Sequence, residues 1–197
     1  FIIFDNNKIV STITLDINPS IEINLTRNEK VKSVVALNED AKEIVNGNLK
    51  GKSIDDTLKQ ITDNLIEKGY VAEENFLEII LYSEGDISNK ELETKLKETL
   101  EKKKIDSNIT TIKKVSKEDE ELAKKYDVSP AKISYIKSII KDNENINIED
   151  LSNKSVSELN ETKATGKYCD KGYTLEGDWC LKEKERISAT SDEVCPR

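Results

Sequence analysis

Residues 9–25 alternate between apolar and polar side chains with a period of two. The apolar positions are Ile9, Ile13, Leu15, Ile17, Pro19, Ile21, Ile23 and Leu25, and the polar ones are Thr12, Thr14, Asp16, Asn18, Ser20, Glu22 and Asn24. Such alternation is typical of a β-strand with one buried face. The segment is much longer than the usual strand of about 5 to 6 residues, and a proline cannot donate to a β-ladder. The pattern therefore predicts a break or turn at Asn18-Pro19.

Strand and helix patterns follow one another along the rest of the chain. The expected strands are 31–37, after a turn at 26–30, then 76–82 and 109–115. The expected helices begin after Ser53, Ser88, Ser116 and Ser129, each of which fits an N-cap, and residues 148–159 form a helical or irregular tail. This order predicts an α+β fold: a mixed β-sheet with an N-terminal hairpin interrupted at Asn18-Pro19, helices packed on one face, then small helices and a Cys-rich tail.

The chain of 197 residues is acidic, with 31 Lys and Arg against 39 Asp and Glu and a formal net charge of -8. This balance argues against a nucleic-acid partner, because neutralising phosphates needs clustered positive charge. The absence of His excludes Ser-His-Asp and Cys-His catalysis and removes the commonest zinc ligand. We therefore expect no multiple-turnover enzyme, no metal and no cofactor.

The Asn18-Pro19 dipeptide is the feature with the clearest chemistry, although such a dipeptide is most often only a turn. Pro19 has no backbone N–H, so Asn18 cannot deamidate through attack by the following backbone nitrogen. The remaining route is attack by the Asn18 side-chain nitrogen on its own main-chain carbonyl, which forms a succinimide and expels the Pro19 nitrogen. We therefore predict autoproteolysis, a single intramolecular event that needs neither His, Cys nor metal.

Asp16 and Glu22 are the candidate assisting groups, because by parity both lie on the same strand face as Asn18. Either carboxylate could accept the amide proton or polarise the amide. Residues 1–18 contain no cysteine, so the cleaved fragment would stay bound through ladder hydrogen bonds and buried apolar side chains. The chain's own fragment 1–18 is thus an expected partner.

Three segments resemble the extracytoplasmic domain of RsgI-type anti-sigma-I factors, which are membrane proteins of Gram-positive bacteria. They are 11–22 with its Asp16-Ile17-Asn18-Pro19-Ser20-Ile21-Glu22 run, 31–38 with its Ala36-Leu37-Asn38 core, and 126–132, where relatives often carry glycine in place of Ala131. The first motif is fairly specific, and the resemblance covers about residues 8–160.

The resemblance implies a single-pass parent protein with a cytoplasmic domain that holds sigma-I and a transmembrane helix before Phe1. In the family, the outer domain self-cleaves at this Asn-Pro bond, and the halves stay associated until a signal separates them. Loss of the outer fragment then permits site-2-type intramembrane proteolysis and sigma-I release. The expected location is the extracytoplasmic side of the cell membrane, with sigma-I and the protease contacted only through parts outside this chain.

Two further features of the sequence concern the expected parent protein and its membrane span. The chain contains no Met and opens abruptly on Phe1, so we expect it to be a piece of a longer polypeptide. It also has no run of about 18 apolar residues, so we expect no membrane span within it.

All three cysteines lie near the C-terminus. Cys169 and Cys180 flank a turn-rich loop, so we expect a structural disulfide between them in an oxidising compartment, with zinc as the rival interpretation. Cys195 begins a segment similar to that after Cys169, which suggests a truncated second repeat and leaves Cys195 unpaired. The expected divisions are a self-cleaving α+β domain at 1–115, a helical extension packed on it at 116–160, and a linker with the truncated Cys-rich module at 161–197.

Two other function classes compete with a self-cleaving sensor. The first is an uncleaved cell-surface binding or adhesion module, in which Asn18-Pro19 is only a kink and Trp179 and Tyr173 contact a cell-wall or polysaccharide ligand. The second is a hydrolase with paired carboxylates such as Asp55-Asp56 or Glu73-Glu74, whose flanks do not distinguish them from solvated helix termini.

Overall fold

A five-stranded mixed sheet forms the centre of the computed structural model, which describes residues 8–71, 75–143, 146–170, 173–176 and 179–182. The strands are β1 (Ile9–Asp16), β2 (Ser20–Thr26), β3 (Val31–Ala36), β4 (Phe76–Gly85) and β5 (Asp106–Thr111). Their order in the sheet is β3-β2-β1-β4-β5, with β5 parallel to β4 and the other neighbours antiparallel. β1 is therefore the central strand and is hydrogen-bonded along both edges.

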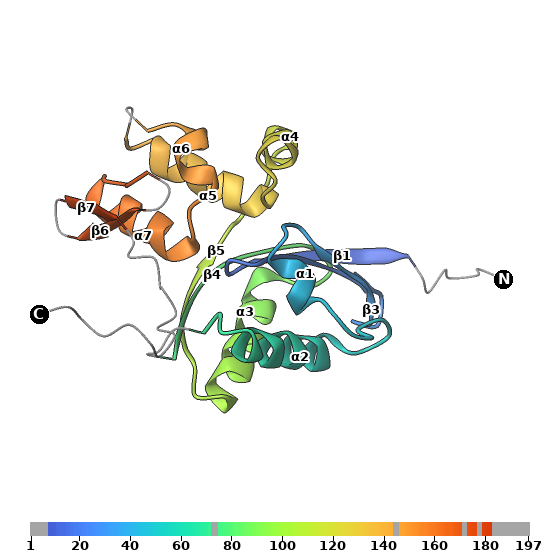
Figure 1. Ribbon diagram of the computed structural model, residues 1–197. Coiled ribbons are helices and arrows are strands. Elements are labelled where there is room, and N and C mark those ends of the chain that lie inside the picture. The colour runs from blue at the N-terminus through green and yellow to red at the C-terminus, as the bar shows by residue number, and fades with distance from the viewer. Residues whose placement is uncertain (1–7, 72–74, 144–145, 171–172, 177–178, 183–197) are drawn as a thin grey trace, which may run out of the picture.

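Helices lie on both sides of this sheet (Figure 1). The helices α1 (Ala41–Ile44), α2 (Ile54–Glu67) and α3 (Asn89–Lys102) belong to one side, and α4 (Lys117–Tyr126), α5 (Pro130–Ile140), α6 (Ile148–Ser152) and α7 (Val156–Thr165) belong to the other. The N-caps expected for α2, α3, α4 and α5 are confirmed, because each serine side chain accepts a hydrogen bond from a backbone N–H in the first turn. The α+β fold class is confirmed.

The odd-numbered positions of β1 and β2 build the main hydrophobic core. Ile13, Leu15, Ile21 and Ile23 are fully buried, and they belong to one cluster with the inward stripes of α2 and α3. This is the face that the period-2 pattern predicts to be buried. Burial of these side chains is the main term that fixes the register of β1.

The even-numbered face of β1 and β2 is also covered, which the alternation does not predict. Polar residues Thr14, Asp16, Ser20 and Asn24 are buried there. Beside them a second apolar cluster forms between Ile80 of β4 and the inner sides of α5, α6 and α7. The later helices therefore enclose a polar surface of the sheet.

The largest differences from the expected boundaries concern β5 and the predicted linker. β5 runs over 106–111 rather than 109–115, because its parallel register against β4 pairs Phe76 with Asp106 and Leu81 with Thr111. The segment expected to begin a linker is helical up to Thr165, since Asn160 accepts a hydrogen bond from the Tyr135 hydroxyl and donates one to Glu78. These tertiary contacts outweigh the polar composition. The division into three domains stays a prediction.

A two-stranded hairpin of β6 (Tyr173–Glu176) and β7 (Trp179–Lys182) follows α7. Within the described ranges, no helix combines the length and the hydropathy needed to cross a bilayer.

Candidate functional site

Asn18-Pro19 lies in the tight connection between β1 and β2. Asp16 and Ser20 are the last Cα partners of the two strands, so only residues 17–19 form the turn. Asn18 is exposed and has a φ of +77°, a left-handed conformation that asparagine adopts more readily than most residues. The Ile17 N–H donates to the Pro19 carbonyl at 2.8 Å, which closes the turn. The predicted break in the strand is confirmed at this position.

The segment after the Asn18-Pro19 bond is held by the Asn38 side chain. Its Oδ1 atom accepts hydrogen bonds from the backbone N–H groups of Ser20 and Ala41, each at 3.1 Å. The Leu37 N–H also donates to the Ser20 carbonyl at 2.9 Å. The Ala36-Leu37-Asn38 segment, singled out in the sequence, thus fixes the first residue of β2.

Asp16 is the buried acidic group of the turn, with only 1% of its surface exposed. Its Oδ2 atom accepts a hydrogen bond from the Ser129 hydroxyl, whereas none of the described residues is hydrogen-bonded to its Oδ1 atom. Burial raises the pKa of Asp16, while the Ser129 and Ser20 hydroxyls and the charge of Lys132 act to lower it. The result is a carboxyl group with one free oxygen and an increased proton affinity.

Glu22, the other candidate assisting group, occupies a different place. Its Oε1 atom accepts from the Asn24 side-chain amide at 2.7 Å, and its Cα partner on β1 is Thr14. It lines a groove of about 380 Å³ with Thr14, Tyr82 and Lys124. Two residues along a strand correspond to about 7 Å, so Glu22 lies farther from the turn than Ser20 does. The structure therefore brings Asp16 to the turn but assigns Glu22 to this groove.

Ser20, Ser129 and Lys132 are site residues that the sequence interpretation did not assign. Ser129 and Lys132 are almost fully buried, at 0% and 5% exposure, and both belong to the first turn of α5. The sequence did point to this region, because Ser129 and Lys132 both lie in the 126–132 segment that resembles the family. The role of these residues depends on the hydrogen bond between Ser129 and Asp16, which are 113 positions apart, and spacing along the chain does not reveal such a contact.

Of the paired carboxylates considered for a hydrolase, the structure describes Asp55 and Asp56, and each of them has another partner. Asp55 and Asp56 occupy the first turn of α2, where Asp55 forms an ion pair with Lys95 and Asp56 accepts from the Ser53 hydroxyl. Glu73 and Glu74 lie outside the described residues. Among the described residues there is also no group of three His, Cys, Asp or Glu side chains arranged to hold a metal ion.

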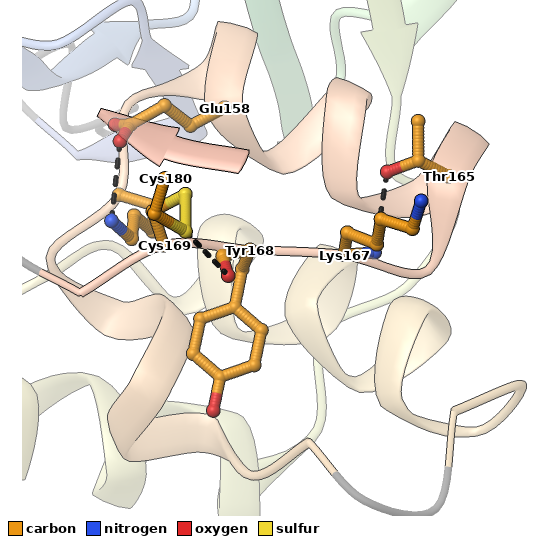
Figure 2. Close-up of a disulfide and its surroundings, with 7 residues drawn as sticks. Glu158, Thr165, Lys167, Tyr168, Cys169 and Cys180 are labelled. Atoms are coloured by element: carbon orange, nitrogen blue, oxygen red, sulfur yellow. Dashed lines mark hydrogen bonds and ion pairs between the residues drawn. A yellow bond between two sulfur atoms is a disulfide. The ribbon is translucent and has the colours of Figure 1, made fainter. Parts of the chain in front are cut away.

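Cys169 and Cys180 form the expected disulfide, with their Cα atoms 5.5 Å apart. Figure 2 shows it next to Tyr168, where the chain leaves α7 and enters the hairpin. The pairing of Cys195 lies outside the described residues. Trp179 is 75% exposed, and strand alternation puts it on the face opposite Tyr173, so the two aromatic residues do not form one surface.

One family model and three known proteins are similar to this chain. Residues 10–138 match the family model described as the anti-sigma factor RsgI-like central domain. The chain is 26% identical over 167 residues to anti-sigma-I factor RsgI7 and 26% identical over 166 residues to RsgI6, both of Acetivibrio thermocellus. It is 32% identical over 147 residues to anti-sigma-I factor RsgI of Bacillus subtilis.

The matched regions cover 82%, 77% and 69% of this chain but only 31%, 22% and 36% of those three relatives. The chain thus spans about a third or less of each relative's length. The family match covers both segments that meet at the turn, the β1–β2 hairpin and the start of α5. The chain belongs to the RsgI family of anti-sigma factors, and its residues 10–138 are the RsgI-like central domain.

Proposed function

We propose that this chain is the extracytoplasmic part of a membrane-anchored anti-sigma-I factor and that it cleaves its own backbone between Asn18 and Pro19. The observation that carries the proposal is the environment of this bond. An exposed asparagine in a left-handed conformation lies in a hairpin turn, two residues after a buried Asp16, one of whose carboxyl oxygens has no hydrogen-bond partner among the described residues.

The proposed reaction is an internal rearrangement. The Asn18 Nδ2 atom attacks the backbone carbonyl carbon of Asn18, and the new C–N bond closes a succinimide ring. The bond from this carbon to the Pro19 nitrogen then breaks. One proton leaves Nδ2 and one reaches the Pro19 nitrogen, which departs as a secondary amine. The two products together have the mass of the intact chain, and no water, metal or oxidant is consumed.

The turn supplies geometry for this weak nucleophile. Hydrogen bonds hold the backbone on both sides of the bond, from Ile17 to Pro19 and from Ser20 to Asn38. A near-attack arrangement can lower a barrier by about 7 to 11 kcal/mol, and a non-glycine residue in a left-handed conformation stores about 1 to 3 kcal/mol. Geometry is therefore the largest contribution expected.

Asp16 is the proposed proton carrier, receiving the proton from Asn18 Nδ2 and delivering one to the Pro19 nitrogen. Its raised pKa suits this role, because a carboxyl group with a higher proton affinity is a better general base and a usable general acid. General acid–base assistance contributes about 10²- to 10⁴-fold in rate. Glu22 has no part in this scheme, since it is engaged with Asn24 in the groove.

The position of β1 supports continued association of the fragments. Residues 1–18 supply the central strand, which pairs with β2 along one edge and with β4 along the other. Ile13 and Leu15 are fully buried and contribute about 1.5 to 3 kcal/mol each. Cutting the turn removes one covalent link and leaves both ladders in place, so a signal must pull β1 out of the sheet.

The signalling role follows from the relatives, which are named anti-sigma-I factors. In the proposed scheme, the membrane anchor precedes residue 1, so residues 1–18 stay on the anchor when the outer fragment 19–197 is lost. This loss permits a site-2-type intramembrane protease to cut the anchor, and the cytoplasmic part then releases sigma-I. The chain acts once per molecule and is not a turnover enzyme. Its direct partner is its own fragment, and sigma-I and the protease are contacted through other parts of the parent protein.

Intact-mass analysis of freshly purified protein under denaturing conditions tests the proposal. Wild type should give fragments 1–18 and 19–197, with the smaller one lighter by one water molecule than a free acid because it ends in a succinimide. Asn18→Ala should stay whole, and Asn24→Ala, a nearby strand asparagine, should still cleave. A wild-type chain that stays intact at 22.3 kDa after prolonged incubation contradicts self-cleavage.

The second candidate function, an uncleaved cell-surface binding module, is favoured by one observation. Trp179 and Leu181 are exposed on the same face of the β6–β7 hairpin, and the disulfide anchors this hairpin to the end of α7. An exposed tryptophan on a fixed hairpin suits stacking against sugar rings of a cell-wall or other polysaccharide. Co-sedimentation with insoluble cell-wall polysaccharide, compared between wild type and Trp179→Ala, tests this function separately from cleavage.

A further inference from the structure

The first turn of α5 contacts the buried carboxyl of the turn, although 113 residues separate Asp16 from Ser129. The Ser129 hydroxyl has two partners. It accepts a hydrogen bond from the Lys132 N–H at 2.9 Å as the N-cap of α5, and it donates its only proton to Asp16 Oδ2. Because a hydroxyl carries one proton, the capping bond fixes the direction in which that proton points. The start of α5 is thereby attached to Asp16 in a single orientation.

Lys132 adds a buried positive charge behind this contact. Its side chain is 5% exposed, and the carboxylates that act on it are Asp16 and Glu158 of α7. Burial lowers the pKa of Lys132, and these two carboxylates counteract that change. The N-terminal end of the α5 macrodipole faces the same carboxyl group through Ser129. Three features of α5 therefore act on Asp16, namely a hydrogen bond, a charge and a dipole.

These contacts determine which atom of Asp16 is available. Since Oδ2 is occupied by Ser129, Oδ1 is left as the oxygen without a partner among the described residues. An unpartnered, fully buried carboxyl oxygen is costly, and such groups are rare away from functional sites. If the Ser129 hydroxyl were absent, Oδ2 would lose the hydrogen bond that holds it, and the carboxyl group would be held less firmly.

We propose that Ser129, supported by Lys132, is a positioning residue for self-cleavage, so that the Asn18–Pro19 bond breaks only after α5 has docked on the sheet. This inference rests on the proposed self-cleavage. It gives the late-synthesised helices a function, because β2 and β4, the two partners of β1, precede α5 in the chain, so that both ladders can form before the site is complete. Cleavage before these ladders form would release residues 1–18 from an unfinished sheet.

Cleavage kinetics of the full chain after a short pulse of cell-free synthesis test this proposal. Synthesis is stopped, aliquots are shifted to buffers from about pH 4 to 9, and the uncleaved fraction is followed on denaturing gels. Ser129→Ala should slow cleavage by about 10- to 100-fold, the effect expected when a reacting group is displaced by about 1 Å. Ser129→Thr keeps the hydroxyl and should restore most of the rate.

The pH profile distinguishes positioning from a merely structural role. Ser129→Ala and Lys132→Met each remove an interaction that favours ionised Asp16, so the midpoint of the rate profile should move to higher pH in both variants. Ser155→Ala is the matched control, because Ser155 caps α7 in the same way and its described bonds do not involve Asp16. Its rate and midpoint should equal those of wild type, with folding of every variant checked by circular dichroism.

The outcomes separate this inference from the proposed function. If wild type does not cleave at all, both fail. If wild type cleaves and Ser129→Ala has the same rate and midpoint, the positioning role is overturned while self-cleavage stands. If Ser129→Ala is slower but neither it nor Lys132→Met moves the midpoint, the role of α5 is structural only, and the proposal is again overturned.

Discussion

The two faces of the central strand differ in what they bury. The odd face of β1 carries Ile13 and Leu15, which are fully buried in the core with α2 and α3. The even face carries Thr14 and Asp16, which are also buried but under a different set of helices. One strand therefore supplies both an apolar anchor and a polar site, and alternation along eight residues keeps them on opposite sides.

The difference shows how stability and chemistry are separated in this domain. Apolar burial on the odd face stabilises the fold and holds fragment 1–18 in place. A buried carboxyl with an unpartnered oxygen on the even face lowers stability, and this is the expected signature of a functional group. Changes on the two faces should therefore affect different measurements.

The largest expected effect is on the even face. Asp16→Asn keeps the shape of the side chain but removes the proton carrier, so cleavage should slow by about 10²- to 10⁴-fold. Its free energy of unfolding should be equal to or above that of the wild type, because a neutral amide is less costly to bury than a carboxylate whose Oδ1 atom has no hydrogen-bond partner among the described residues. Rate measurements after pulse synthesis, together with urea unfolding, check both parts. Glu22→Gln is the matched control and should cleave at the wild-type rate.

A substitution on the odd face of β1 should lower stability and leave the cleavage rate unchanged. Leu15→Ala removes a fully buried side chain and should lower the free energy of unfolding by about 2 to 5 kcal/mol. Cleavage should still occur, but fragment 1–18 should dissociate faster, as seen by size-exclusion chromatography of the cleaved protein. Val35→Ala is the control, because the Val35 side chain of β3 is exposed, and it should change stability by less than about 0.5 kcal/mol. If Leu15→Ala blocked cleavage while leaving stability unchanged, the separation of the two faces would be wrong.

The pH dependence of the free energy of unfolding, caused by the titration of Asp16, should be a smaller effect than the two above. Its pKa is raised in the folded protein, mainly by burial, so between its ordinary value of 3.8 and the raised value the folded state binds more protons than the unfolded state. The contribution of Asp16 to stability therefore falls as pH rises through this window. The stability advantage of Asp16→Asn over wild type should grow from about pH 3.5 upward and then level off, as measured by urea unfolding. An advantage that does not vary with pH would contradict the raised pKa.

The disulfide is expected to affect cleavage least. It joins Cys169, which follows α7, to Cys180 of β7, and neither residue belongs to the turn between β1 and β2. Replacing both cysteines by serine should loosen the β6–β7 hairpin, since a loop of about this size gains about 3 kcal/mol from the link. Proteolysis between Cys169 and Cys180 should become faster, whereas the cleavage rate at Asn18 should change by less than about twofold. A large loss of cleavage would show that the hairpin and the site are coupled.

The sequence predicts those parts of the fold that depend on local patterns. Alternation with Pro19 locates the turn, and serine N-caps such as Ser53 locate the starts of helices, because both signals act within a few residues. The disulfide also follows from local spacing. The helical state of residues 160–165 does not, since it depends on Asn160 bridging Tyr135 and Glu78.

The candidate site is predicted only in part for the same reason. Asn18 and Pro19 are recognised from their chemistry. Parity, however, puts Asp16 and Glu22 on the same strand face and makes both of them candidate assisting groups. The contact between Asp16 and Ser129 distinguishes them, and it exists only once α5 has packed on the even face of the sheet. The hairpin register already puts Asp16 nearer the turn than Glu22, but the burial and hydrogen bonding of the Asp16 carboxyl group depend on long-range packing, which the strand pattern does not reveal.

The central claim is that the chain is cut at Asn18–Pro19 and remains assembled. Mass spectrometry of one purified sample, under native and then denaturing conditions, tests both halves of this claim. The account predicts a single native species with the 22.3 kDa mass of the whole chain, which separates into fragments 1–18 and 19–197 on denaturation. A single chain of 22.3 kDa under both conditions would contradict cleavage, and free fragments under native conditions would contradict retention by β1.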